Sequence, residues 1–410
     1  MNAVRRAMRA AIYLPLLAVA AHAAGAPGDG DTAAQAIDPQ VKAVAAGDTS
    51  FGLALIGTLV AGGGAKNVFV SPFSVSQALG LAYNGAAGET RQQIGGALGA
   101  GGMSQDVSNQ ANRSLLDSLQ SQDPKFTISV ANALWAKQGI TLNAAYKERM
   151  RRYYDATADT LNFRDPSGAA AINDWVDKNT QGRITQIVTP GALRTSDAVL
   201  TNAIYFHADW SQPFKKLSTH DGSFTLGDGT TKTLPMMSQM STFSYLENDR
   251  FQAVRLPYGS GRAAMYVFLP KAGDTLDAFV ENATAANWDT WISAMRKTPV
   301  LLTMPKFKAE QSVTLNKPLM SMGITDAFGP KADFSPMGLR GSFISDVIHK
   351  AVLDVDEEGT TAAAATAIIM TRSAMMAPKN RMIVDHPFFC AIRDDRSGAL
   401  LFAGAIRNPQ

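Results

Sequence analysis

The 410-residue sequence predicts one α+β domain, with helices mostly first and strands later. Up to about residue 182, apolar residues recur mostly at helical spacing. From about residue 198, short segments rich in β-branched and aromatic residues predominate. After residue 40 there is no repeat and no long Gly, Ser or Pro tract. Length alone would suggest two domains, but the missing linker favours a single domain over 41–410.

The expected helices are marked by apolar spacing and by their end residues. Ser71-Pro72 is a favourable helix start and Asn84-Gly85 a favourable end. Segment 126–137 interrupts this half, because its alternation is typical of a strand. The segments predicted to be helical are 38–62, 71–86, 89–98, 105–123, 143–156 and 168–182.

The expected strands are alternating or short apolar segments bounded by turn residues. Asp228-Gly229 separates two of them and predicts a hairpin turn, and the last two predict a terminal hairpin. The segments predicted to be strands are 198–210, 223–237 around that turn, 252–258, 263–270, 300–310, 381–394 and 398–409.

Residues 1–23 predict a cleaved export signal, with a basic start, a short apolar run and a small-x-small site at Ala21–Ala23. An uncleaved anchor is the competing interpretation, but the run is shorter than the roughly 20 residues of a membrane span. Residues 24–40 are small and polar and predict a flexible linker. We therefore expect an exported protein, periplasmic or secreted to the extracellular space, without stable membrane association.

The charge and the cysteine content argue against a nucleic-acid-binding protein and against a disulfide-stabilised one. The net charge is +3, and basic residues are scattered among acids, which argues against a nucleic-acid ligand. The basic segment 146–155 is interpreted as a solvated helix face. Cys390 is the single cysteine, so no intrachain disulfide forms, and its apolar neighbours predict a buried, inert thiol.

No pattern in the sequence supports catalysis. There is no G-x-S-x-G, no H-E-x-x-H and no S-x-x-K followed by K-T-G. The five histidines do not lie at metal-ligand spacing. The sequence therefore predicts neither an enzyme nor a bound metal or cofactor.

The most unusual segment is Thr360 to Thr371, twelve residues without charge or proline that follow Glu357-Glu358-Gly359. A surface helix would carry charge on its outer face. As a strand, the segment has small or apolar side chains on both faces, which suits a central strand covered on both sides. The pattern predicts a segment able to become an interior strand, with Gly359 as the hinge.

This segment resembles the reactive-centre-loop hinge of the serpins, the serine protease inhibitor family. The resemblance extends over about 45–409 through four further blocks. These blocks are "NVFVSPFSVSQALGLAYNGAAGETRQQI", "AINDWVDKNTQGRITQIV", "VLTNAIYFHADWSQPF" and "DHPFFCAIRDDRSGALLFAGAIRNP".

The resemblance implies a metastable fold of three β-sheets and about nine helices, with an exposed reactive-centre loop at about 357–380. It implies a suicide inhibitor of serine endopeptidases, with cysteine endopeptidases as a further target class, that has no catalytic residues of its own. The cleaved loop would enter the main sheet and trap the protease as an acyl complex. The alternative is a non-inhibitory serpin acting as carrier, chaperone or storage protein.

The family pattern assigns roles to residues of the loop. The hinge match is formed by Glu357, Glu358, Gly359, Thr360, Ala362, Ala363, Ala364 and Ala365. Counting fourteen residues from Gly359 gives Ser373–Ala374 as the reactive bond, with Arg372 as the alternative P1 residue. Ser373 would suit an elastase-like or subtilisin-like protease, whereas Arg372 would suit a trypsin-like one.

Further matches lie outside the loop. Ser71, Ser74, Asn202 and His349 match a polar cluster beneath the point where the main sheet opens. Lys306 and Trp210 match residues at the top of that sheet. The stretch that binds heparin in some serpins, 104–125 here, holds only Arg113 and Lys125 as basic residues, so heparin binding is not expected. We expect a monomer that is able to form loop-sheet polymers.

Overall fold

The computed structural model describes residues 37–64, 66–100, 102–120, 125–360 and 379–409. The signal segment and most of the linker lie outside this part, and the first helix begins at Pro39. Nine α-helices occur in the described residues. They are α1 (Pro39–Gly63), α2 (Pro72–Gly85), α3 (Gly88–Ala97), α4 (Gln105–Leu119), α5 (Ala144–Tyr154), α6 (Pro166–Asn179), α7 (Leu276–Asn282), α8 (Ala285–Ala294) and α9 (Asn316–Ser321).

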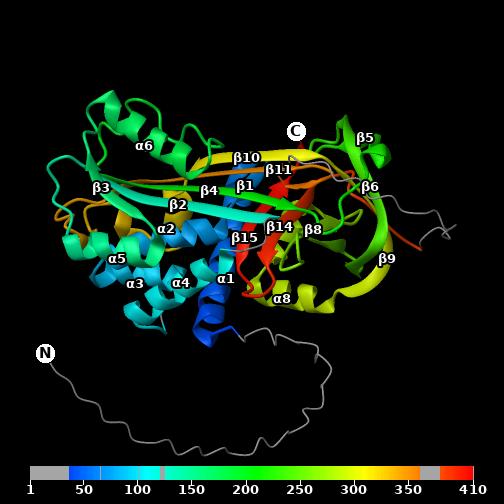
Figure 1. Cartoon of the computed structure of the whole chain (residues 1–410), viewed down its shortest axis with the longest axis horizontal. Helices are drawn as coiled ribbons and strands as arrows, with labels where there is room; N and C mark the ends of the chain where they lie inside the picture. Colours follow the sequence, from blue (N-terminus) through cyan, green and yellow to red (C-terminus); the bar gives the residue numbers. More distant parts are fainter. Residues whose placement is uncertain (1–36, 65, 101, 121–124, 361–378, 410) are drawn as a thin grey trace, which may run out of the picture. The chain divides into compact units, whose positions relative to one another are not determined.

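A six-stranded sheet is covered by helices on both faces (Figure 1). Side chains of α2 and α5 pack on one face, and α6 packs on the other. In order across the sheet, its strands are β10 (Phe307–Thr314), β11 (Ile344–Val355), β12 (Gly359–Thr360), β4 (Ala198–Asp209), β2 (Phe126–Lys137) and β3 (Thr157–Leu161).

The other nine strands are connected through an eight-stranded path, and β5 pairs with β6 beside it. Residues 236–245 of the long β6 pair with β9, and its last four pair with β7, so β6 joins the second and third sheets that the resemblance implied. The path is β1 (Val68–Val70), β15 (Leu400–Ile406), β14 (Phe388–Asp394), β8 (Ala263–Pro270), β7 (Phe251–Pro257), β6 (Thr231–Glu247), β9 (Arg296–Pro305) and β13 (Asn380–Ile383), with β5 (His220–Thr225) on β6.

The α+β class is confirmed, with several differences in the strands. Segment 381–394 is not one strand, because it is divided into β13, which pairs with β9, and β14, which pairs with β8 and β15. Segment 300–310 is not one strand, because it is divided at Lys306 between β9 and β10, which belong to different sheets. The central strand β11 was not predicted. Its burial alternates along most of the strand, but the polar residues Asp346, His349 and Lys350 interrupt the apolar pattern in the sequence. Short or irregular elements such as β1, β3, α7, α8 and α9 were also not predicted.

The expectation for Cys390 is confirmed. Cys390 is buried, and burial raises the pKa of its thiol to about 12, which keeps it protonated and inert. Helix α1 is long and apolar enough to cross a membrane, but 56% of its apolar window is buried within the protein, as in a core helix.

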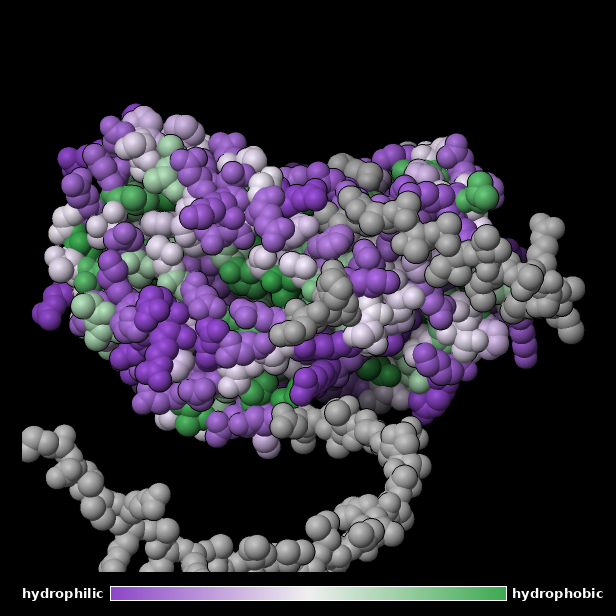
Figure 2. Space-filling model, viewed as in Figure 1, coloured by the Kyte–Doolittle hydropathy of each residue, from purple (hydrophilic) through white to green (hydrophobic). Residues whose placement is uncertain are grey.

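Hydrophilic residues cover most of the face shown in Figure 2, and apolar residues appear there in small separate patches.

Candidate functional site

Strands β4 and β11 run parallel and then separate, and the start of the hinge lies between them. Their pairing extends from Ala198 opposite Ile344 to Ile204 opposite Ala351. Beyond that point β12 occupies the space, with Thr360 opposite both Ala208 of β4 and Val355 of β11. We call this space between the diverging strands the slot. Gly359 and Thr360 of the predicted hinge thus already form strand pairs inside the six-stranded sheet.

Position 359 has no room for a side chain. A Cβ atom at this position would lie 2.2 Å from the carbonyl oxygen of Ala208 and 2.7 Å from the Cα atom of Asp209. Both are backbone atoms, so they cannot rotate away. Glycine is therefore required where the chain enters the sheet.

The acidic residues before Gly359 are tied to their surroundings. The Glu357 carboxylate accepts from Lys306 at 2.8 Å and from the Thr219 hydroxyl at 2.8 Å. Burial alone would raise the pKa of Glu357, but these hydrogen bonds outweigh it and lower the pKa below its usual range. Glu358 accepts from Lys216 at 2.6 Å. The hinge therefore begins from an anchored segment.

Trp210 lies against the same turn. Its indole Nε1–H donates to the Asp356 carbonyl at 2.9 Å, and its backbone N–H donates to the Glu358 carbonyl at 2.8 Å. The ring stacks on Tyr258 with the centroids 4.4 Å apart. The Tyr258 hydroxyl is in turn 2.7 Å from the Thr360 hydroxyl. The structure thus brings Trp210, Lys306 and the start of the hinge together at one end of the slot.

The polar cluster of Ser71, Ser74, Asn202 and His349 lies further along the same two strands. Ser71 N–H donates to Nε2 of His349 at 3.1 Å, and Nδ1 of His349 is bonded to the Asn202 side chain. The Asn202 amide donates to the Ser74 carbonyl at 2.8 Å. All four residues are fully buried. The cluster therefore links β4, β11 and α2 where the two strands are still paired.

Asn132 is a fifth member that sequence reasoning missed. It lies on β2 opposite Asn202, is 2% exposed, and accepts from the Asn202 amide at 2.5 Å. A single amide among alanines and large apolar residues in segment 126–137 was the available signal. The Ser71 hydroxyl also donates to the Leu401 carbonyl at 2.6 Å, which connects the cluster to β15.

The remaining predicted site residues lie outside the described part of the chain. These are Ala362, Ala363, Ala364, Ala365, Arg372, Ser373 and Ala374.

The pH dependence of stability should reveal two buried groups with opposite effects. Burial lowers the pKa of His349 from 6.5 to about 3, so stability is lost as pH falls through that range, by about 1.4 kcal/mol per unit. Burial raises the pKa of Asp48 on α1 from 3.8 to about 7, so stability is lost as pH rises there. Between about pH 4 and 6.5 the two effects oppose each other.

We expect Asp48→Asn to remove that opposition. Urea midpoints of the variant should fall with each unit of acidification below pH 6.5, whereas wild-type midpoints change less. Identical slopes for both proteins between pH 4.5 and 6.5 would contradict this account.

Comparison with known proteins identifies the fold. The family profile described as Serpin (serine protease inhibitor) matches residues 46–409. The chain belongs to the serpin family. This serpin is 38% identical over 354 residues to an uncharacterized serpin-like protein of Thermococcus kodakarensis, covering 85% of this chain and 82% of the relative. It is 33% identical over 381 residues to the leukocyte elastase inhibitor of Bos taurus, covering 90% and 100%.

Solved serpin structures agree with this assignment. The thermophilic serpin tengpin in its native state superposes with a TM-score of 0.84 at 28% identity, covering 91% of this chain and 95% of tengpin. Human thyroxine-binding globulin complexed with its hormone gives 0.84 at 26% identity, covering 90% and 100%. Serpins with different functions therefore share this architecture.

Proposed function

We propose that this serpin is a suicide inhibitor of serine endopeptidases. The protease's serine oxygen attacks the carbonyl carbon of the reactive bond. The amide C–N bond breaks, a proton passes to the leaving amine, and an ester joins the two proteins. The cleaved loop then enters the slot and carries the esterified protease with it, which stalls hydrolysis. The observation that carries the proposal is β12, where the hinge already pairs with β4 and β11.

The lengths of the three segments support insertion. Strands β4 and β11 are each twelve residues long. Continuing the register of Thr360 opposite Val355 one residue at a time places Thr371 opposite Ile344, the first residue of β11. The neutral run from Thr360 to Thr371 therefore has the length of the strands that it would separate.

The energetics favour the inserted state. Insertion breaks one ladder between β4 and β11, which spans seven paired positions, and forms two longer ones. Each net hydrogen bond contributes roughly 0.5–1.5 kcal/mol. The free energy of the inserted form is therefore expected to be lower by on the order of 10 kcal/mol, which is comparable with the free energy of unfolding of a whole domain.

The same register brings Thr366 to the polar cluster. If it continued from β12 after insertion, this register would place Thr366 opposite both His349 and Asn202, on the face where Thr360 already lies close to Tyr258. Separating the strands breaks the bond between His349 and Asn202. A threonine hydroxyl, which donates and accepts, is suited to bridge the separated side chains.

We expect Thr366→Val to weaken the loop-cleaved form but not the native form. Valine has the shape of threonine but would leave Nδ1 of His349 and Oδ1 of Asn202, which bond to each other in the native form, without a partner after insertion. This loss should cost about 1–3 kcal/mol. The measurement is thermal unfolding of each protein before and after loop cleavage. The matched control is Thr361→Val, which faces the opposite side of the inserted strand. Equal melting temperatures for the two cleaved variants would contradict the register.

The class of target protease follows from which peptide bond of the loop is cleaved. Incubation with trypsin, pancreatic elastase and subtilisin in turn, followed by SDS gel electrophoresis, should give a covalent band at the summed mass. Mass spectrometry of the released peptide distinguishes Ser373–Ala374 from cleavage after Arg372. The same gel, run with a cysteine endopeptidase, tests the wider class.

A carrier function is the second candidate, because thyroxine-binding globulin shares the architecture closely. A carrier would be cleaved as a plain substrate. The protease would then keep full activity, and no covalent band would form with any member of the panel.

We also propose that the protein is exported and cleaved after Ala23. The basic start, apolar run and small-residue site of residues 1–23 support this. N-terminal sequencing of the protein from the periplasm or medium should begin at Ala24. Recovery of only the full-length chain with the cells would contradict it.

A further inference from the structure

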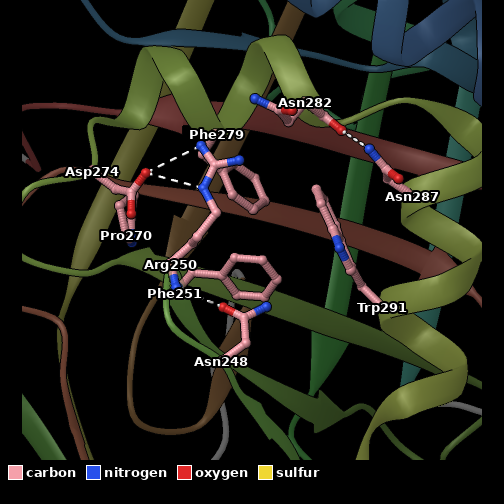
Figure 3. A pocket seen from close by; sticks show the side chains of 9 residues that line it. All are labelled: Asn248, Arg250, Phe251, Pro270, Asp274, Phe279, Asn282, Asn287 and Trp291. Atoms are coloured by element: carbon pink, nitrogen blue, oxygen red, sulfur yellow. Dashed lines mark hydrogen bonds and ion pairs between the residues drawn. The ribbon is translucent and has the colours of Figure 1, made fainter.

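A pocket of about 230 Å³ lies far from the hinge in the topology, between the start of β7, the end of β8, α7 and α8 (Figure 3). Drug-sized ligands usually occupy about 300–1,000 Å³. This pocket therefore suits one small ring rather than an extended molecule. Its lining combines an aromatic wall with several amide side chains, and neither has a role in the mechanism proposed above.

The wall consists of Phe251, Phe279 and Trp291. The Trp291 centroid lies 5.1 Å from that of Phe251 and 5.2 Å from that of Phe279. The two phenylalanines are buried, whereas Trp291 is partly exposed. Because the rings pack directly on one another, they form a continuous surface rather than a cage. A ligand would lie against this surface.

Three asparagines leave polar atoms free at the pocket. Oδ1 of Asn248 accepts from the backbone N–H groups of Arg250 and Phe251, both at 2.9 Å, so its Nδ2 remains a donor. Nδ2 of Asn282 donates to Ala278, and Nδ2 of Asn287 donates to the Asn282 carbonyl, so each keeps Oδ1 as an acceptor. Within the described residues, these three free atoms and the indole Nε1–H of Trp291 have no hydrogen-bond partner.

The charges at the rim cancel. Nε and Nη2 of Arg250 each donate to Oδ1 of Asp274 at 3.1 Å. The pair therefore has no net charge but keeps the remaining N–H groups of Nη1 and Nη2 as donors and Oδ2 of Asp274 as an acceptor. An anion would find no unpaired cation here, and a cation would find neither an enclosing cage nor an unpaired carboxylate.

We propose that this pocket binds one neutral, polyhydroxylated ring, the chemistry of a pyranose sugar. The C–H face of a pyranose packs on the negative π-face of an aromatic ring, here Trp291. Its hydroxyl groups both donate and accept, and so match the mixed donors and acceptors of the three asparagines. A purely apolar ligand would bury these amides without partners, which is unfavourable.

The test is saturation-transfer NMR on the whole protein with methyl glucoside, methyl galactoside, methyl mannoside and N-acetylglucosamine. Cyclohexanol serves as a ring with a single hydroxyl. We expect at least one sugar to give a saturable signal that cyclohexanol at the same concentration does not displace. The absence of a saturable signal from all four sugars would overturn the proposal.

The informative variant is Asn248→Asp. It keeps the Oδ1 acceptor that caps the turn but replaces the free donor by an acceptor. The matched control is Asn162→Asp, where Oδ1 accepts from Arg164 N–H in an exposed turn of the same kind. We expect about a tenfold weaker affinity for Asn248→Asp and no change for Asn162→Asp. Equal affinities for both variants would place the sugar elsewhere and reject the site.

Discussion

Replacing Thr360 by arginine is expected to abolish the covalent complex while leaving the loop cleavable. Thr360 is fully buried in β12, and its hydroxyl lies 2.7 Å from that of Tyr258. Because this position is already buried before cleavage, we expect an arginine to draw residues 359 and 360 out of the slot. Loop insertion would then have to bury the charge without a carboxylate partner, at a cost of several kcal/mol. Because each 1.4 kcal/mol is a factor of ten, insertion should become slower than hydrolysis of the ester.

The measurement is the number of inhibitor molecules consumed for each protease molecule inhibited, which should rise at least about tenfold in Thr360→Arg. Thr360→Ser is the matched control, because it stays small and keeps the hydroxyl. A normal covalent band from Thr360→Arg would show that insertion does not pass through the slot. The absence of a band from the wild-type protein would instead reject inhibition itself.

Replacing Asn202 by alanine is expected to be the most destabilising single change at the site. The substitution removes partners of His349, Ser74 and Asn132 at once. Each buried polar group left without a partner costs about 1–3 kcal/mol, so we expect a loss of about 3 kcal/mol or more. The weakened contact also links β4 to β11, so the slot should open more readily.

The loss should appear as a lower urea midpoint, together with polymers on a native gel after mild heating. The matched control is Asn179→Ala, an exposed asparagine at the end of α6 that donates only to Trp175. If Asn202→Ala matched this control in both assays, the cluster would not hold the sheet closed.

Most helices and many strands of this serpin follow from local pattern. Helix α2 begins after Ser71, whose hydroxyl accepts from Ser74 N–H, as the Ser-Pro start indicated. By contrast, β11 has polar and charged residues among its apolar ones, and its position in the centre of a sheet depends on which strands lie beside it. Likewise, the chain passes from one sheet to the other at Lys306. The local sequence does not predict this, because both halves of segment 300–310 have strand character.

The candidate site divides in the same way. The family resemblance indicated which residues to examine, such as Gly359 and His349, but the reason for each lies in tertiary contacts. The requirement for glycine comes from Ala208, about 150 positions earlier in the chain. Asn132 was missed because only the register of β2 on β4 places it opposite Asn202.

In the proposed mechanism, the pairing of β4 and β11 would make inhibition depend on two competing rates, that of strand separation and that of ester hydrolysis. The loop would separate the strands from the end at Ile204 and Ala351, next to β12, toward the end at Ala198 and Ile344. Each step takes time, and the ester can hydrolyse while the steps proceed. A sheet held too firmly would release an active protease, whereas one held too loosely would insert its loop before any protease arrived. The pairing of β4 and β11 should therefore have an intermediate stability. It should be weak enough for insertion to finish within the lifetime of the ester.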